Sequence, residues 1–305
     1  MKKVKIFQVD AFTQKAFGGN PAGVVPEADD LNEEEMQAIA AEINCSETAF
    51  VSKSEKSKAD FHLRFFTPSE EVDLCGHATI AAFYVLAHEG RVRKENLETV
   101  VKQETKAGIL PVHILWDKSG QIQRVVMEQT LPTLLSTQKD KSEVAKLMGL
   151  DESDLELNGL PMQIVSTGLP DLMVPIKNLD ALKKATPDFE KLAHYQRKHN
   201  FISIHAFTFE TENPENDVCV RDFAPSVQIN EEAATGTANG ALGAYLVINK
   251  ALSLPKNPLI LKIEQGNGMG RPSRIVVEIS HEEGRVTLVK VGGSAVIVLE
   301  GFITF

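Results

Sequence analysis

Glu47 is the residue of this 305-residue sequence that is best placed to move a proton. It lies in the stretch Cys45–Val51, which turns from a loop into a strand, and it stands between the hydroxyl residues Ser46 and Thr48. A carboxylate at the mouth of an apolar strand loses part of its hydration, which raises its pKa toward the range useful for general acid/base catalysis. The alternative interpretation is an exposed glutamate at the end of a strand.

His77 is the second candidate for acid/base chemistry. It follows Gly76 at the beginning of the apolar stretch Leu74–Leu86, where it can hydrogen-bond a substrate or relay a proton. A histidine that only caps or packs against a helix start is the alternative. The spacing of the histidines and of Cys75 matches neither His-Glu-x-x-His nor paired cysteines, so the sequence predicts no metal site.

Cys75 and Thr235 occupy equivalent positions, directly before Gly76 and Gly236. Two thiols that face one carbon from opposite sides would suit a two-base racemase. Threonine is not a comparable acid or base, so this pair favours transfer by a single base. Cys75 can equally be a small buried residue of the core.

Two apolar stretches, Leu74–Leu86 and Ala234–Leu246, are predicted to position these residues. Each is apolar on all sides after its first turn, which is typical of a helix buried at the centre of a domain. The first turn of each is small or polar, and a helix start leaves backbone N–H groups unpaired. We therefore expect both helix starts to bind an anionic group.

The strands before the two helices indicate an internal duplication. Ser46–Ser69 laid on Ser203–Ser226 at a constant offset of 157 gives nine identical pairs, where chance would give about one or two. Glu47 faces Ile204 in this alignment although its neighbours match, so this carboxylate distinguishes the two halves. That asymmetry favours a functional role for Glu47.

The order of elements predicts an α+β protein of two duplicated domains, each a mixed, curled, barrel-like sheet wrapped round a central buried helix. We expect the first domain to span residues 1–118 together with a C-terminal strand at about 290–305, and the second to span 119–289. Surface helices are expected at 33–44, 141–148 and 180–199. The active site is expected in the cleft between the domains.

Composition narrows the function further. The net charge of −10 repels phosphate backbones, so nucleic acid is not an expected partner. No apolar run is long enough to span a bilayer, and the N-terminus passes directly into a strand pattern without the core of a signal peptide. Three cysteines without paired spacing favour a reducing, cytoplasmic setting.

Two glycine-rich stretches do not predict a cofactor. Gly266–Gly270 is followed by Arg271 and a strand pattern, whereas a dinucleotide fingerprint must open a helix. Ala234–Thr237 lacks the lysine of a phosphate-binding loop. We therefore expect a protein that acts without a cofactor.

Several motifs together resemble the phenazine biosynthesis PhzF-like proteins, in the order of that family and over nearly the whole chain. They are Gly19–Gly23, Ser46–Phe50, Phe66–Pro68, Cys75–Thr79, Ala234–Ala238 and Gln265–Ser273. The resemblance implies a fold like that of diaminopimelate epimerase, with two similar domains and an active site between them. It also implies a homodimer, and a cofactor-free isomerisation such as that of a dihydro-hydroxyanthranilate.

The resemblance assigns the proton-shuttling glutamate of the family to Glu47 and its active-site histidine to His77. Before the second helix the family usually reads Glu-Asp-Pro-Ala-Thr-Gly-Ser, whereas this chain has Glu232 for the aspartate and Thr237 for the serine. Each replacement keeps the functional group, a carboxylate or a hydroxyl, but changes the size of the side chain that carries it. The resemblance therefore carries a reaction type rather than a particular substrate.

We expect a cofactor-independent isomerase that moves a proton on a small carboxylate-bearing metabolite. Glu47 and His77 are the expected catalytic residues, and the expected substrate-binding residues are Gly76, Glu232, Gly236, Thr237, Asn20 and Ser46. A racemase or epimerase is the nearest alternative enzyme. A ligand-binding or interaction protein that keeps the scaffold without turnover is the alternative from another class.

Overall fold

The computed structural model describes residues 1–56, 58–252 and 257–305 and divides into two compact units. Unit 1 consists of Met1–Glu128 and Gly292–Phe305, and unit 2 of Gln129–Val291. From the sequence, residues 119–128 were expected in the second domain instead. They belong to unit 1 because the hairpin formed by β7 (Gly108–Trp116) and β8 (Ile122–Gln129) keeps them paired with that unit.

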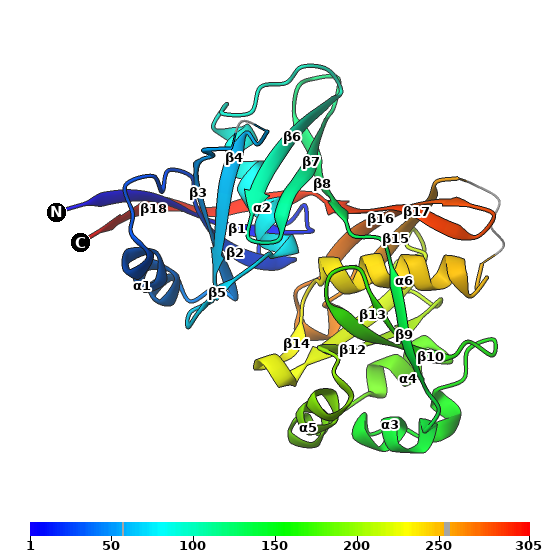
Figure 1. Ribbon diagram of the computed structural model, residues 1–305. Coiled ribbons are helices and arrows are strands. Elements are labelled where there is room, and N and C mark those ends of the chain that lie inside the picture. Colours follow the sequence, from blue (N-terminus) through cyan, green and yellow to red (C-terminus); the bar gives the residue numbers. More distant parts are fainter. Residues whose placement is uncertain (57, 253–256) are drawn as a thin grey trace. The chain divides into compact units, whose positions relative to one another are not determined.

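Unit 1 is a mixed sheet curled round one apolar helix, α2 (Gly76–His88), as the sequence predicts. Eleven of the thirteen residues of α2 are buried, and the helix contacts β1, β2, β3, β7 and β18 (Figure 1). The other elements of unit 1 are β1 (Lys3–Ala11), β2 (Asn20–Val25), α1 (Glu33–Ile43), β3 (Glu47–Lys53), β4 (Phe61–Phe66), β5 (Glu71–Val72), β6 (Glu98–Thr105) and β18 (Ala295–Thr304).

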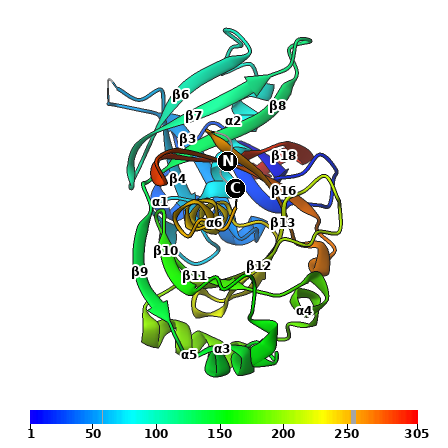
Figure 2. The same ribbon diagram turned by 90° about the vertical axis from the view of Figure 1, so that its right-hand side faces the viewer.

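The two ends of the chain close the sheet of unit 1. β1 pairs antiparallel with β18 along its whole length, from Lys3↔Thr304 to Ala11↔Ala295, and on its other side with β2. Beyond the strands, Lys2 N donates to the carbonyl of Phe305 at 2.6 Å. The termini therefore lie side by side (Figures 1 and 2).

Unit 2 repeats this plan round α6 (Gly236–Ile248), which contacts β10, β11, β12 and β16. β11 pairs parallel with β12, β12 antiparallel with β13, and β13 parallel with β15, as β2, β3, β4 and β6 pair in unit 1. The remaining bounds are β9 (Thr133–Gln138), α3 (Lys141–Leu147), η1 (Glu152–Asp154), β10 (Met162–Ser166), β11 (Pro170–Pro175), α4 (Leu179–Lys184), α5 (Phe189–His199), β12 (Ser203–Thr208), β13 (Val218–Ala224), η2 (Pro225–Val227), β14 (Ile229–Glu232), β15 (Leu259–Gln265), η3 (Asn267–Met269), β16 (Ser273–Glu282) and β17 (Arg285–Gly293).

Individual ion pairs are also duplicated. In unit 1, Arg64 Nε donates to Glu71 Oε1 at 2.7 Å, and in unit 2 Arg221 Nε donates to Glu231 Oε1 at 2.8 Å. Each arginine also donates to the second oxygen of its carboxylate, which gives a two-pronged pair. Glu231 is therefore the structural counterpart of Glu71.

The stretch expected as one surface helix at 180–199 is two helices, α4 and α5. Pro187 has no backbone N–H and disfavours a helical residue before it, which separates them. Asp188 then caps α5, since its Oδ1 accepts from the backbone N–H of Lys191 at 3.2 Å. Within the described ranges, none of the helices combines the length and apolarity needed to cross a membrane.

Gly19 sets the start of β2 and gives a testable prediction about stability. Its φ is +61°, and a Cβ added there would lie 2.1 Å from the carbonyl oxygen of Ala11. Gly90 has a similar φ of +70° but open space within 4 Å, so Gly90→Ala should cost only the left-handed backbone penalty of about 1 kcal/mol. We expect Gly19→Ala to lower the free energy of unfolding by roughly twice that or more in urea titrations, because the clash adds to the penalty. Equal losses in the two variants would contradict this prediction.

Candidate active site

Glu47 and His77 meet inside unit 1. Glu47 is the first residue of β3 and is the register partner of Ala22 in the parallel neighbour β2, while His77 is the second residue of α2. Glu47 Oε2 lies 3.2 Å from His77 Nε2, and the two side chains are only 14% and 4% exposed. The two catalytic candidates of the sequence are therefore brought together in a buried place.

The ring of His77 is held by two other residues that the sequence singled out. Ser46 Oγ lies 3.1 Å from Nε2 of the ring, and Asn20 Nδ2 lies 3.3 Å from Nδ1. Cys75 Sγ is 3.5 Å from Nδ1. Because both ring nitrogens have polar neighbours, the orientation of the imidazole is fixed against Glu47.

The pKa of Glu47 is lowered, contrary to the sequence-based expectation. Burial does act to raise it, but the positive charge of His77 lowers it, helped by Ser46 and Cys75, and the lowering outweighs the burial. The expectation was wrong because the sequence shows that Glu47 is enclosed but not that a histidine 30 residues later lies beside it. Glu47 is therefore ionised at neutral pH.

The pKa of His77 is raised well above its usual range. Burial opposes the charged ring, but the negative charges that Cys75 and Glu47 can carry favour it. Burial and the charge of Glu47 raise the pKa of the Cys75 thiol to about 11, so that thiol is neutral at pH 7. At neutral pH, the negative charge that stabilises the protonated ring of His77 is therefore that of the Glu47 carboxylate.

One oxygen of Glu47 is left without a hydrogen bond. Oε2 is buried and has no hydrogen-bond partner among the described residues, although His77 Nε2 is only 3.2 Å away. The close nitrogen is outside hydrogen-bonding geometry with this oxygen and has Ser46 Oγ within hydrogen-bonding distance instead. A buried carboxylate oxygen without a well-aligned donor is costly and calls for an explanation, of which a catalytic role is one.

The candidates in unit 2 gather at the start of α6. Thr235 precedes Gly236, and its Oγ1 donates to Glu232 Oε2 at 2.5 Å. Gln129 Nε2 donates to the carbonyl of Gly236 at 3.1 Å. Thr167 Oγ1, between β10 and β11, donates to the carbonyl of Thr237 at the same distance. The three candidates of this unit, Glu232, Gly236 and Thr237, are thus each hydrogen-bonded at or just before the start of α6.

A sequence model of one family, described as "Phenazine biosynthesis-like protein", matches residues 9–301. The chain belongs to the phenazine biosynthesis-like family. An uncharacterized isomerase of Clostridium acetobutylicum is 38% identical over 98% of each chain. With several relatives of this description, the chain is an isomerase.

Solved structures agree with the fold of the phenazine biosynthesis-like family. A PhzF family protein of Bacillus anthracis is 35% identical, covers 100% of both chains and has a TM-score of 0.89. A hydroxyproline epimerase of Agrobacterium vitis, solved with bound trans-4-hydroxy-L-proline, is 12% identical with a TM-score of 0.65 over 99% of this chain and 91% of its own. The second likeness shows the fold alone, and it confirms the epimerase-like architecture that the sequence predicts.

In this member of the phenazine biosynthesis-like family, three side chains of unit 1 could hold a metal ion. One donor atom each from Glu47, Cys75 and His77 lies within 4.8 Å of the others. Spacing along the sequence could not reveal this group, because its members come from a strand start and a helix start. A metal there would have to displace the proton of the Cys75 thiol, whose pKa is about 11.

The raised pKa of Cys75 gives a prediction that separates one-base from two-base chemistry in the phenazine biosynthesis-like isomerase. With a thiol pKa of about 11, only about one molecule in 10⁴ carries the thiolate at pH 7. We expect Cys75→Ala to keep proton-transfer activity within about threefold, since a neutral thiol is a poor base. A loss of about 100-fold or more with an unchanged melting temperature would identify Cys75 as a second base.

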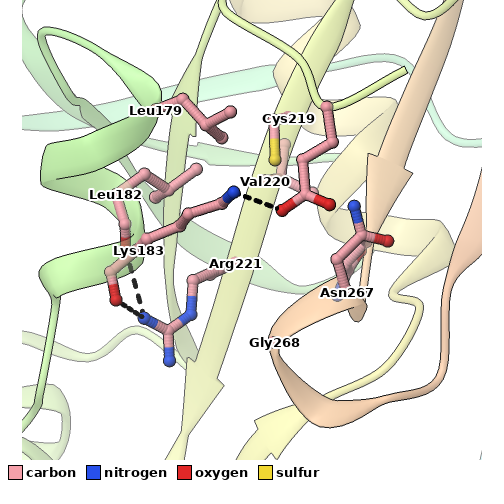
Figure 3. A pocket seen from close by; sticks show the side chains of 10 residues that line it. Leu179, Leu182, Lys183, Cys219, Val220, Arg221, Asn267 and Gly268 are labelled. Atoms are coloured by element: carbon pink, nitrogen blue, oxygen red, sulfur yellow. Dashed lines mark hydrogen bonds and ion pairs between the residues drawn. The ribbon is translucent and has the colours of Figure 1, made fainter.

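The cavity drawn in Figure 3 lies in unit 2 and has a volume of about 230 Å³. Lys183 Nζ lies 2.7 Å from Glu212 Oε1 across it, and Arg221 Nη1 donates to the carbonyls of Leu182 and Lys183 at 3.1 and 3.4 Å. Burial raises the pKa of the Cys219 thiol well above its usual range. Lys183 thus pairs with Glu212, Arg221 pairs with Glu231, and the Cys219 thiol stays protonated, so we do not place the chemistry there.

Sequence reasoning missed a buried polar group in unit 2. Asp171, Ser203, His205 and Asp222 are each at most 2% exposed. The duplication carried the signal, because at the offset of 157 His205 faces Thr48 and Asp222 faces Phe65. In a duplicated chain, an ionisable residue whose counterpart is uncharged is a candidate for a functional role, as Glu47 is.

Proposed function

We propose that this phenazine biosynthesis-like isomerase moves a proton on a small carboxylate-bearing metabolite, with Glu47 as the general acid and base. The observation that carries the proposal is Oε2 of Glu47, which is buried, ionised and without a hydrogen bond among the described residues. A C–H group is too weak a donor to replace a hydrogen bond to a good acceptor. A base for carbon acids therefore benefits from an oxygen that no N–H or O–H occupies.

His77 supports this role through charge. The imidazolium keeps Glu47 deprotonated before the reaction, and Ser46 Oγ, 3.1 Å from Nε2, can accept from the charged ring and keep it in place. When Glu47 accepts the proton, the positive charge of His77 loses its partner in the protein, so it can stabilise negative charge that develops on the substrate. Glu47 then returns the proton to another carbon on the same face.

The first turn of α2 supports the choice of a carboxylate-bearing substrate. The structure gives its N-cap residue Cys75 no side-chain capping bond among the described residues. The positive end of the helix beginning at Gly76 is next to His77, and helix starts favour anionic groups. The sequence-based prediction that Glu232, Gly236 and Thr237 also contact the substrate stays part of this proposal.

The test is a screen of small carboxylates in D₂O, including a dihydro-hydroxyanthranilate, followed by proton NMR and melting curves. The proposal predicts that at least one compound both raises the melting temperature and gains deuterium at carbon in the presence of the wild-type protein. A non-catalytic binding protein would shift the melting temperature without exchange. A racemase or epimerase would also invert the configuration at the exchanging carbon.

A further inference from the structure

A continuous chain of buried polar side chains runs through unit 2, and the proposed chemistry of Glu47 does not use it. Its first members are neighbours in the sheet. Asp171 on β11 is the register partner of Ser203 on β12, and His205 on β12 is the partner of Asp222 on β13. Such a set of titratable groups must satisfy its hydrogen bonds internally, because it is closed to water.

The number of hydrogens available to Asp171, Ser203 and Asp222 indicates which of the two carboxyl groups is protonated. Ser203 Oγ lies 2.9 Å from Asp171 Oδ1 and 2.7 Å from Asp222 Oδ1, and one hydroxyl hydrogen cannot serve two carboxylates. Burial, together with the negative charge of Asp222, raises the pKa of Asp171 well above its usual range. Asp171 is therefore neutral and donates to Ser203, which donates to the Asp222 carboxylate. The second oxygen of Asp171 has no partner in the described part of the chain, which a neutral carbonyl oxygen tolerates better than an ionised one.

The same counting assigns the ring of His205, which is fully buried. Its Nδ1 is 2.7 Å from Asp222 Oδ1 and its Nε2 is 3.3 Å from Asn239 Oδ1. The orientation of the Asn239 amide is set by its nitrogen, which donates to the carbonyl of Thr235 at 2.8 Å and to Gln265 Oε1 at 2.9 Å. Both ring nitrogens therefore face acceptors, and a ring that carries hydrogen on both nitrogens would satisfy both contacts and pair with Asp222.

From Asn239 the chain continues to the start of α6. Gln265 Nε2 donates to the backbone carbonyl of Glu232 at 2.9 Å and to Thr235 Oγ1 at 3.1 Å. Thr235 Oγ1 in turn donates to Glu232 Oε2 at 2.5 Å. Both the backbone and the carboxylate of Glu232 thus accept hydrogen bonds from Gln265 and Thr235, which are linked to His205 through Asn239.

We propose that Asp222 and His205 are positioning residues, whose buried ion pair fixes the carboxylate of Glu232 through Asn239, Gln265 and Thr235. The consequence for catalysis rests on the proposed function, in which Glu232 contacts substrate. Glu232 is one methylene longer than the aspartate usual in the family, and a longer side chain has more rotamers to restrict. The fixed chain of donors supplies that restriction.

NMR on the whole chain tests the positioning without any substrate. In the wild-type protein at neutral pH, we expect two ring N–H resonances for His205 and slowly exchanging side-chain amide hydrogens on Asn239 and Gln265. Asp222→Asn removes the charge beside His205 and should speed that exchange at least 10-fold. Asp171→Asn is the matched control, because it replaces a neutral acid by a neutral amide and should change exchange less than threefold.

Two results would overturn the positioning role. One is a single ring N–H on His205 in the wild-type protein, which needs no variant to fold. The other is equal exchange in Asp171→Asn and Asp222→Asn. The proposed function can fail separately, because retention of exchange in Glu47→Gln would refute it and leave these NMR results unchanged.

A double-mutant cycle on the compound that exchanges deuterium tests the consequence for substrate. If Asp222 acts through Glu232, adding Asp222→Asn to a Glu232→Gln background should lower kcat/KM by less than twofold more, although Asp222→Asn alone lowers it about 10-fold. Fully additive losses would instead mean that the pair only stabilises unit 2, and this part of the proposal would be wrong.

Discussion

Glu47→Gln should lower the rate of carbon-bound proton exchange by about 10³-fold or more while the fold remains intact. Glutamine keeps the shape of the side chain but has no carboxylate to accept a proton. Because the variant keeps the volume of the side chain and removes only its negative charge beside His77, it tests the carboxylate as a base and not the packing of the side chain. Deuterium incorporation into the best compound of the carboxylate screen, followed by NMR, measures the loss.

The matched control for this variant is Glu42→Gln, which changes an exposed glutamate on α1 of the same unit. It should exchange deuterium at the wild-type rate. If Glu47→Gln keeps exchange within tenfold of wild type on the same compound, Glu47 is not the base, and the oxygen without a hydrogen bond needs another explanation.

His77→Gln should have the second largest effect, by raising the pKa of Glu47 above its usual value near 4.5. In the wild-type protein burial acts to raise that pKa, but the charge and hydrogen bond of His77, together with Ser46 and Cys75, outweigh burial and lower it. Without His77, burial should dominate. We expect the rate at pH 7 to fall about 100-fold, because the variant loses the charge that stabilises the developing anion. A ¹³C-NMR titration of the Glu47 carboxyl measures the pKa directly and needs no substrate.

The pH dependence of the wild-type pair follows from the two shifts. Glu47 has a lowered pKa, so its share of stability is present above about 4.5 and is lost as the pH falls through its folded pKa. His77 has a raised pKa, so its share is present below about 6.5 and is lost as the pH rises through a value well above 6.5. The ion pair therefore holds between these two limits, and activity should fall on both sides.

In His77→Gln the alkaline loss that belongs to His77 should disappear and the acid loss should begin at a higher pH. His88→Gln, an exposed change in the last turn of the same helix, is the control and should leave both limits in place. An unchanged Glu47 pKa in His77→Gln would show that the imidazolium does not set the charge of this site.

The sequence predicted much of the fold because the duplication left a readable pattern. Apolar residues on all sides of α2 and α6 require burial at the centre of a sheet, and this prediction is confirmed. The boundary near 118 was placed too early, since a turn in the sequence does not reveal which strand the next one pairs with. Only the pairing of β7 with β8 decides that residues 119–128 belong to unit 1.

The sequence predicted the residues of the candidate site better than it predicted their pKa shifts. Glu47, His77, Ser46 and Asn20 were singled out, and the structure brings them together. The pKa direction of Glu47 was wrong because it depends on a distance of 3.2 Å between residues from different elements. In unit 2 the pair of His205 and Asp222 could not be predicted for the same reason, because the two residues meet only through the register of β12 and β13.

The pairing of β1 with β18 has a consequence for how the chain is made. The β1 segment is made before unit 2, yet the strand that covers one of its edges is made only after unit 2. Unit 2, by contrast, is one continuous segment and can complete its own sheet while translation is still under way. Until residues 292–305 emerge from the ribosome, this edge of β1 is free to pair with another strand, so the protection of unit 1 against aggregation comes only after unit 2 has been made.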